Sequence, residues 1–147
     1  MPHISGILET ALYVNDLHRS VEFYQRLFKL TTLHISERLV ALRVAPGQVL
    51  LIMKQGTSAE PSLMSFGVIP ASNGAGQQHV AFGIRPDQID EWRDRLQQHA
   101  VEVESALEWP EGGHSLYFRD PDGRCIELKT SDWDGELLPS VGSSASR

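Results

Sequence analysis

The sequence has little of what marks several large protein classes. Cysteine occurs once, as Cys125, so an intrachain disulfide is excluded and a reducing, cytoplasmic location is expected. No apolar run is long enough to cross a bilayer, and the first residues lack the basic and apolar regions of a signal peptide. The formal net charge of −6 gives no indication of a basic surface that would bind nucleic acid. Neither a membrane nor a nucleic acid is therefore expected as a partner.

What remains has the composition of an ordinary globular domain. The chain has 147 residues, of which 41% are hydrophobic and 22% charged. That length is enough for one domain with a proper core.

The residues from about 7 to 55 read as one module. An alternating strand is followed by an amphipathic helix, whose cap is expected at Asn15-Asp16, and then by three more strands. The expected elements are the strand Ile7–Val14, the helix from about Leu17 to Phe28, and the strands Thr31–Ser36, Leu39–Val44 and Gln48–Lys54.

The same order returns from about 77 to 132. The expected elements are the strand Gln78–Ile84, a helix from Pro86 to about His99, the strand Val101–Ala106, and a hairpin of Ser115–Arg119 with Arg124–Lys129. On the helix, Trp92 is expected to face the core and Arg95 the solvent. The tail from 133 to 147 is Ser-rich near its end and is expected to be disordered there.

The connection from 56 to 76 is rich in Gly, Ser, Ala and Pro, and is long for a plain linker. It also carries five large apolar residues, Leu63, Met64, Phe66, Val68 and Ile69. We expect this segment to pack over the domain, over a partner chain, or across a site as a lid.

The two modules can be laid on each other as an internal repeat. Residues 42–54 align with 117–129 without a gap, which places Ile52 on Glu127. The first strands align with Glu9 over His79, or one residue from that. The sequence thus predicts an α+β fold of two βαβββ modules related by a pseudo-twofold axis.

Such an axis would bring the equivalent strand positions together. Two carboxylates and one imidazole, from Glu9, Glu127 and His79, would suit a divalent cation with open coordination positions. The alternative is that Glu9 and His79 form a polar pair near a cleft and that Glu127 lies on a solvated strand face. A buried carboxylate is normally paired, protonated or bound to metal, so burial would separate the two interpretations.

Three stretches, LETALYVNDLHRSVEFYQRLFKL, QQHVAFGI and GGHSLYFRDPDGRCIELK, are similar to the vicinal oxygen chelate superfamily. That group includes glyoxalase I, bleomycin-resistance proteins, fosfomycin-resistance enzymes and extradiol dioxygenases. The resemblance covers about Leu8 to Lys129. It implies paired modules that form an incomplete barrel around a central cleft and a metal.

The resemblance places the family's metal ligands on Glu9, His79 and Glu127. Relatives usually carry His or Gln at the first of these positions, and glyoxalase I has a fourth ligand where this chain has Ile52. The extradiol dioxygenases hold Fe(II) with two histidines and one carboxylate, whereas this chain offers one histidine and two carboxylates. A glyoxalase-like lyase, isomerase or transferase is for that reason favoured over an extradiol dioxygenase. The implied cofactor is one divalent ion, of Mn, Fe, Ni or Zn.

The resemblance also implies a small-molecule substrate that chelates the metal through two neighbouring oxygens. Glu9 is the candidate general base, Tyr117 is a candidate catalytic and substrate-binding residue, and Ser115 and Arg119 are candidate substrate contacts. For Arg119, a salt bridge with Asp120 or Asp122 at the turn is the alternative. A homodimer is expected. The alternative function is a metal-free drug-binding protein of the bleomycin-resistance type.

Overall fold

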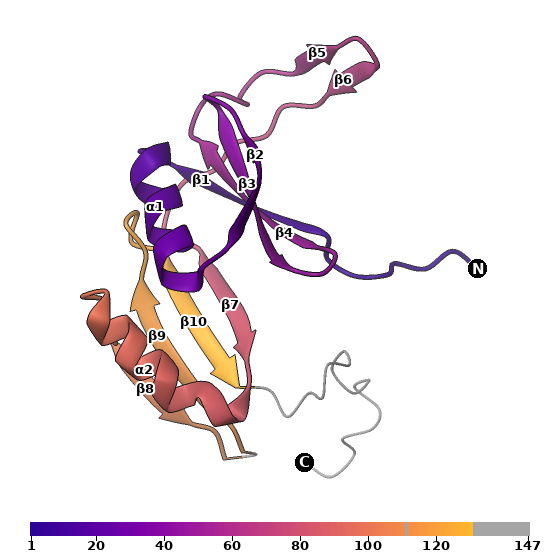
Figure 1. Ribbon diagram of the computed structural model, residues 1–147. Coiled ribbons are helices and arrows are strands. Elements are labelled where there is room, and N and C mark those ends of the chain that lie inside the picture. Colours follow the sequence, from indigo (N-terminus) through magenta and orange to yellow (C-terminus); the bar gives the residue numbers. More distant parts are fainter. Residues whose placement is uncertain (111, 131–147) are drawn as a thin grey trace. The chain divides into compact units, whose positions relative to one another are not determined.

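The computed structural model describes residues 1–110 and 112–130 of the chain. It contains two four-stranded sheets, each with its own α-helix (Figure 1). The first sheet has the order β1-β4-β3-β2 and the second β7-β10-β9-β8, so corresponding strands take corresponding places. The predicted α+β fold with two βαβββ modules is thereby confirmed. The pseudo-twofold axis, the barrel and the cleft relate one module to the other and stay predictions.

The first module follows the sequence pattern closely. Its elements are β1 (Glu9–Val14), α1 (Leu17–Phe28), β2 (Thr31–Ile35), β3 (Leu39–Ala45) and β4 (Gln48–Lys54). β1 pairs with β4 in parallel, and the other pairs are antiparallel. Helix α1 begins where expected because the Asp16 carboxylate accepts a hydrogen bond from the Arg19 backbone N–H, at 3.0 Å.

The core of this module lies under α1, which contacts β3 and β4. Tyr24 and Leu27 are buried on the helix and face a sheet of alternating apolar residues. The buried strand residues include Leu12, Val14, Leu42, Leu50 and Ile52. Glu9 and Ala11 are exposed, as the strand alternation predicts.

The second module contains β7 (His79–Ile84), a 3₁₀ turn (Pro86–Gln88), α2 (Ile89–Gln98), β8 (Ser105–Glu108), β9 (His114–Arg119) and β10 (Cys125–Thr130). The predicted strand 101–106 was wrong by four residues at its start. Pairing with β9 decides the register: Ser105 lies opposite Tyr117, and Glu108 opposite His114. On α2, Trp92 and Arg95 are both half-buried, so the expectation that Arg95 faces solvent was wrong, and Leu96 is the buried residue.

The connection from 56 to 76 forms a hairpin of β5 (Ser62–Met64) and β6 (Gly67–Ile69). Its base is held by Arg38, which donates to the Thr57 carbonyl and to Ser62 Oγ. The five apolar side chains are nevertheless exposed, with Leu63 at 82% and Phe66 at 81%. The expectation that they pack over their own domain was therefore wrong, whereas packing over a partner chain or across a site as a lid stays a prediction.

Packing groups the chain into two compact units. Among the described residues, the first unit comprises Met1–Val80 and Arg119–Cys125, and the second comprises residues from 81 to 118 and from 126 to 130. The turn between β9 and β10 thus packs with the first module. Among the described residues, none of the helices has the length and apolarity to span a bilayer. The prediction for the tail from 133 to 147 lies outside the described residues.

Candidate metal and substrate site

Glu127 is a buried carboxylate in the second unit. It is the third residue of β10, it is 5% exposed, and its neighbours Ile126 and Leu128 are fully buried. Ser115 on β9 donates a hydrogen bond from Oγ to Glu127 Oε1 at 2.6 Å. The solvated-face interpretation of Glu127 is therefore wrong. Burial of a carboxylate in such surroundings requires compensating partners, of which Ser115 is one.

Ser115 has a second partner that sequence analysis missed. The indole Nε1–H of Trp109 donates to Ser115 Oγ at 2.8 Å. Ser115 is fully buried, and its one proton goes to Glu127. The predicted substrate contact of Ser115 stays a prediction and would compete with this hydrogen bond. A tryptophan just before the Pro-Glu-Gly-Gly turn is the signal that could have pointed to Trp109.

His79 opens β7 and belongs to the first unit. Its Nδ1 lies 2.9 Å from the Cys125 carbonyl oxygen. A carbonyl only accepts, so a ring proton is assigned to Nδ1, which in the neutral tautomer leaves the lone pair on Nε2. The Cys125 N–H donates to the Gln78 carbonyl at 2.9 Å, which holds this part of β10 against the start of β7. The arrangement is typical of histidine ligands, whose second nitrogen is oriented by a backbone carbonyl.

Glu9 opens β1, is exposed, and has Val49 of β4 as its Cα partner. It lies in the same unit as His79, whereas Glu127 lies in the other. Within either described unit, no three His, Cys, Asp or Glu side chains gather closely enough to hold a metal ion. The convergence of Glu9, His79 and Glu127 would draw on both units and stays a prediction.

Tyr117 and Arg119 follow Ser115 along β9 on the same side of the strand. Tyr117 is half-buried and Arg119 is exposed. Arg119 Nη1 donates to the Gly123 carbonyl at 3.3 Å, which ties this side chain to the turn. The substrate contacts predicted for both residues stay predictions.

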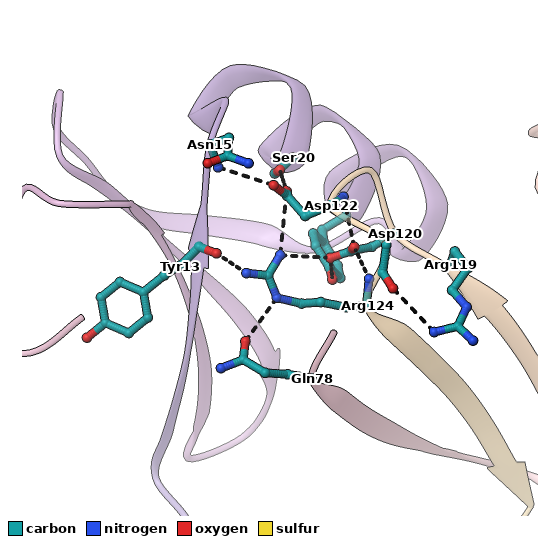
Figure 2. A network of polar contacts seen from close by, with 10 residues as sticks. Tyr13, Asn15, Ser20, Gln78, Arg119, Asp120, Asp122 and Arg124 are labelled. Atoms are coloured by element: carbon teal, nitrogen blue, oxygen red, sulfur yellow. Dashed lines mark hydrogen bonds and ion pairs between the residues drawn. The ribbon is translucent and has the colours of Figure 1, made fainter. Parts of the chain in front are cut away.

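A buried arginine, Arg124, organises the turn between β9 and β10, and sequence analysis did not single it out (Figure 2). Its guanidinium donates to Gln78 Oε1 at 3.1 Å and to the Tyr13 carbonyl. It also pairs with Asp120 and Asp122, each at 3.5 Å. The turn of the second repeat is thus locked to the end of β1 and to the residue before His79.

The two aspartates of this turn also accept hydrogen bonds from the start and middle of α1. The Tyr24 hydroxyl donates to Asp120 at 2.7 Å, and Ser20 Oγ and the Asn15 N–H donate to Asp122 at 3.0 and 3.2 Å (Figure 2). Burial, and then the Asp120 charge, raise the pKa of Tyr24 well above its usual range. Tyr24 therefore remains a neutral donor.

Comparison with known proteins finds chains that are similar in sequence and fold. The crystal structure of lactoylglutathione lyase from Agrobacterium tumefaciens is 32% identical, with a TM-score of 0.79 over 90% of this chain and 98% of that one. Metallothiol transferase FosB of Shouchella clausii (strain KSM-K16) is 23% identical over 129 residues, which are 86% of this chain and 81% of that protein. A variant of the fosfomycin resistance protein FosX from Listeria monocytogenes, crystallised with Mn(II) and 1S,2S-dihydroxypropylphosphonic acid, is 26% identical. Its TM-score is 0.64 over 86% of this chain and 90% of that one.

A family model also matches the chain over residues 6–128. This range begins just before β1 and ends within β10, so it takes in both modules and all three predicted ligand positions. The chain belongs to the Glyoxalase/Bleomycin resistance protein/Dioxygenase superfamily.

Proposed function

We propose that the protein is a divalent-metal-dependent enzyme of the glyoxalase type, which acts on a small molecule that offers two neighbouring oxygen atoms. The proposed ligands are Glu9, His79 and Glu127. One observation carries the proposal: the Glu127 carboxylate is buried between apolar neighbours and oriented by Ser115. A carboxylate kept in this environment suits a cation as its further partner.

The chemistry of the donors supports a metal. His79 has the tautomer in which Nε2 carries the lone pair, because Nδ1 donates to the Cys125 carbonyl. Carboxylate and imidazole donors suit Mn²⁺, Fe²⁺, Ni²⁺ and Zn²⁺. Two of the similar proteins are named for metals, one as a metallothiol transferase and one as a complex with Mn(II). When bound, the ion would supply Lewis-acid stabilisation of the charge that develops on the substrate as an enolate, oxyanion or alkoxide.

Lyase, isomerase or transferase chemistry is the proposed reaction class, in keeping with the lactoylglutathione lyase and metallothiol transferase to which the chain is similar. Glu9 is exposed and is the first residue of its strand, so it is the carboxylate proposed to loosen from the metal and take a proton from the substrate. Tyr117 is proposed to donate a hydrogen bond to the substrate. The exposed guanidinium of Arg119 is suited to an anionic group such as the phosphonate bound by the FosX variant.

A thermal titration tests the metal. Chelator-treated protein should melt at a higher temperature when Mn²⁺, Fe²⁺, Ni²⁺ or Zn²⁺ is added, because metal at about 100 times its dissociation constant adds roughly 2.7 kcal/mol. Glu127→Gln and His79→Ala should lose most of the rise. The matched control is Ile52→Ala at the equivalent position of the first module, which should destabilise through a cavity and keep the metal response.

Two results would contradict the proposal: an unchanged melting curve with all four metals, or a Glu127→Gln variant that responds like the parent. Either would favour the alternative, a metal-free protein that binds and sequesters a small molecule. A drug-binding titration on the same metal-free sample would then establish that function.

We also propose a homodimer in the cytoplasm. The apolar side chains of the β5–β6 hairpin are exposed in the single chain. A two-stranded hairpin is marginally stable by itself in water, and burial of each large apolar side chain contributes about 1.5–3 kcal/mol. A second copy that covers the hairpin would satisfy both requirements. The single cysteine, Cys125, suits a reducing compartment.

A further inference from the structure

We propose that Trp109 and Ser115 form a positioning relay that orients Glu127 for its ligand role, an inference that rests on the proposed metal function. The relay consists of two hydrogen bonds in series within the second unit. Trp109 Nε1 lies 2.8 Å from Ser115 Oγ, and Ser115 Oγ lies 2.6 Å from Glu127 Oε1. Trp109 has no part in the general-base step or the substrate contacts described above. Ser115, which the sequence predicted as a substrate contact, is here proposed as a positioning residue instead.

The direction of both bonds follows from the chemistry of the groups. The indole Nε1–H can only donate, so Ser115 Oγ must accept from Trp109. The hydroxyl has one proton, which it donates to Glu127 Oε1. Trp109 therefore prevents the hydroxyl from turning its proton elsewhere. The 2.6 Å separation lies within the range of O–H···O hydrogen bonds.

The loop that precedes β9 is built to hold the indole in place. The Trp109 N–H donates to the Gly113 carbonyl and the Gly112 N–H donates to the Trp109 carbonyl, both at 2.9 Å. Gly113 has a φ of +90°, and a Cβ there would lie 3.0 Å from Thr130 Oγ1. A side chain at this position would be strained by the backbone conformation and crowded against Thr130, so glycine is favoured there.

The face of the Trp109 indole contacts a side chain of β10. Lys129 Nζ lies 4.5 Å from the centroid of the Trp109 ring, in a cation–π contact. Lys129 and Glu127 are two residues apart on β10 and share one side of the strand. Trp109 is thus attached to β10 through its ring face and to β9 through its nitrogen.

The consequence of the relay concerns the Glu127 carboxylate. Oε1 accepts the hydrogen bond from Ser115, so the relay fixes the orientation of the carboxylate as a whole. Groups that orient a ligand in this way typically change metal affinity by about 10–100-fold when they are removed. Because Trp109 acts only through Ser115, its effect should disappear when the Ser115 hydroxyl is absent.

The test is a double-mutant cycle on Mn²⁺ affinity, measured by the electron paramagnetic resonance signal of free Mn²⁺. Ser115→Ala should raise the dissociation constant about 10–100-fold, and Trp109→Phe up to about 10-fold. The double variant should bind as Ser115→Ala does, because one pathway carries both effects. Trp92→Phe makes the same chemical change on α2 and should bind like the parent. Ser115→Thr keeps the hydroxyl and should restore affinity to within a few-fold.

The outcomes separate the relay from the proposed function. If the parent and Trp92→Phe bind Mn²⁺ while Ser115→Ala and Trp109→Phe bind it equally well, the relay is wrong and the metal function stands. If the two substitutions act additively, Trp109 works independently of Ser115 and the relay is likewise overturned. If the parent binds neither Mn²⁺ nor the other three metals, both inferences fail. Circular dichroism of each variant checks that a change in Mn²⁺ affinity does not come from misfolding. Trp109→Phe is the milder of the two substitutions and serves as a second check.

Discussion

The strongest structural prediction concerns Arg124, a residue that is 1% exposed and whose guanidinium joins a turn of the second repeat to the first module. Replacing it by methionine keeps much of the side-chain volume and removes the charge and all donors. Removal of one partner from a buried ion pair usually destabilises a protein by about 3–5 kcal/mol. The contacts decide where in that range Arg124→Met should lie.

The loss of stability caused by Arg124→Met should lie near the lower end of that range. Asp120 keeps donors from Tyr24 and from the backbone of Asp122 and Arg124, and Asp122 keeps Ser20 and Asn15. The Gln78 side chain is exposed, so water can replace its lost donor. We therefore expect a loss of about 3 kcal/mol. At about 2–4 °C per kcal/mol for a chain of this size, the melting temperature should fall by roughly 6–12 °C.

The assay is thermal and urea unfolding of the parent and two variants. Arg119→Met is the matched control, because Arg119 flanks the same turn and is exposed, and its effect should stay within about 0.5 kcal/mol. Equal melting temperatures for Arg124→Met and Arg119→Met would refute the reasoning. They would mean that the buried network contributes no more to stability than a surface contact.

Three further predictions each concern a single residue. Because the pKa of Tyr24 is raised by folding, its contribution to the free energy of unfolding is complete below about pH 10, where the unfolded tyrosine is also neutral, and falls above that pH by up to about 1.4 kcal/mol per pH unit. Urea unfolding at pH 9 and 11 should show a smaller pH dependence for Tyr24→Phe than for the parent. An equal pH dependence in the two proteins would count against this prediction. Gly113→Ala should destabilise the protein by more than about 1 kcal/mol in thermal unfolding, whereas Gly47→Ala would strain φ alone and should be milder. Phe66→Ser in the hairpin should weaken dimerisation in sedimentation velocity without lowering the stability of the monomer, and a parent that sediments as a monomer at micromolar concentration would contradict the dimer.

The sequence by itself determined the local elements and the repeat. Helix α1 has the predicted bounds because its apolar spacing and its Asp16 cap act over single turns. Strand β4 also has the predicted bounds, and the gapless alignment of 42–54 with 117–129 places both final turns correctly. Glu127 could be singled out because the alignment of the two modules places it on Ile52, where a buried carboxylate would need a partner. The family followed from the same stretches.

The tertiary structure alone decided the register of β8, the burial of Arg124, the Trp109–Ser115–Glu127 contacts and the exposure of the hairpin. Register is decided by the facing strand, so residues 101–104 could not be excluded from β8 by their own sequence. An arginine next to a turn usually remains in solvent, and Arg124 is buried only because donors and acceptors about 100 residues away, on β1 and α1, converge on it and its aspartate partners. Satisfaction of buried polar groups depends on such long-range geometry, which local spacing does not contain.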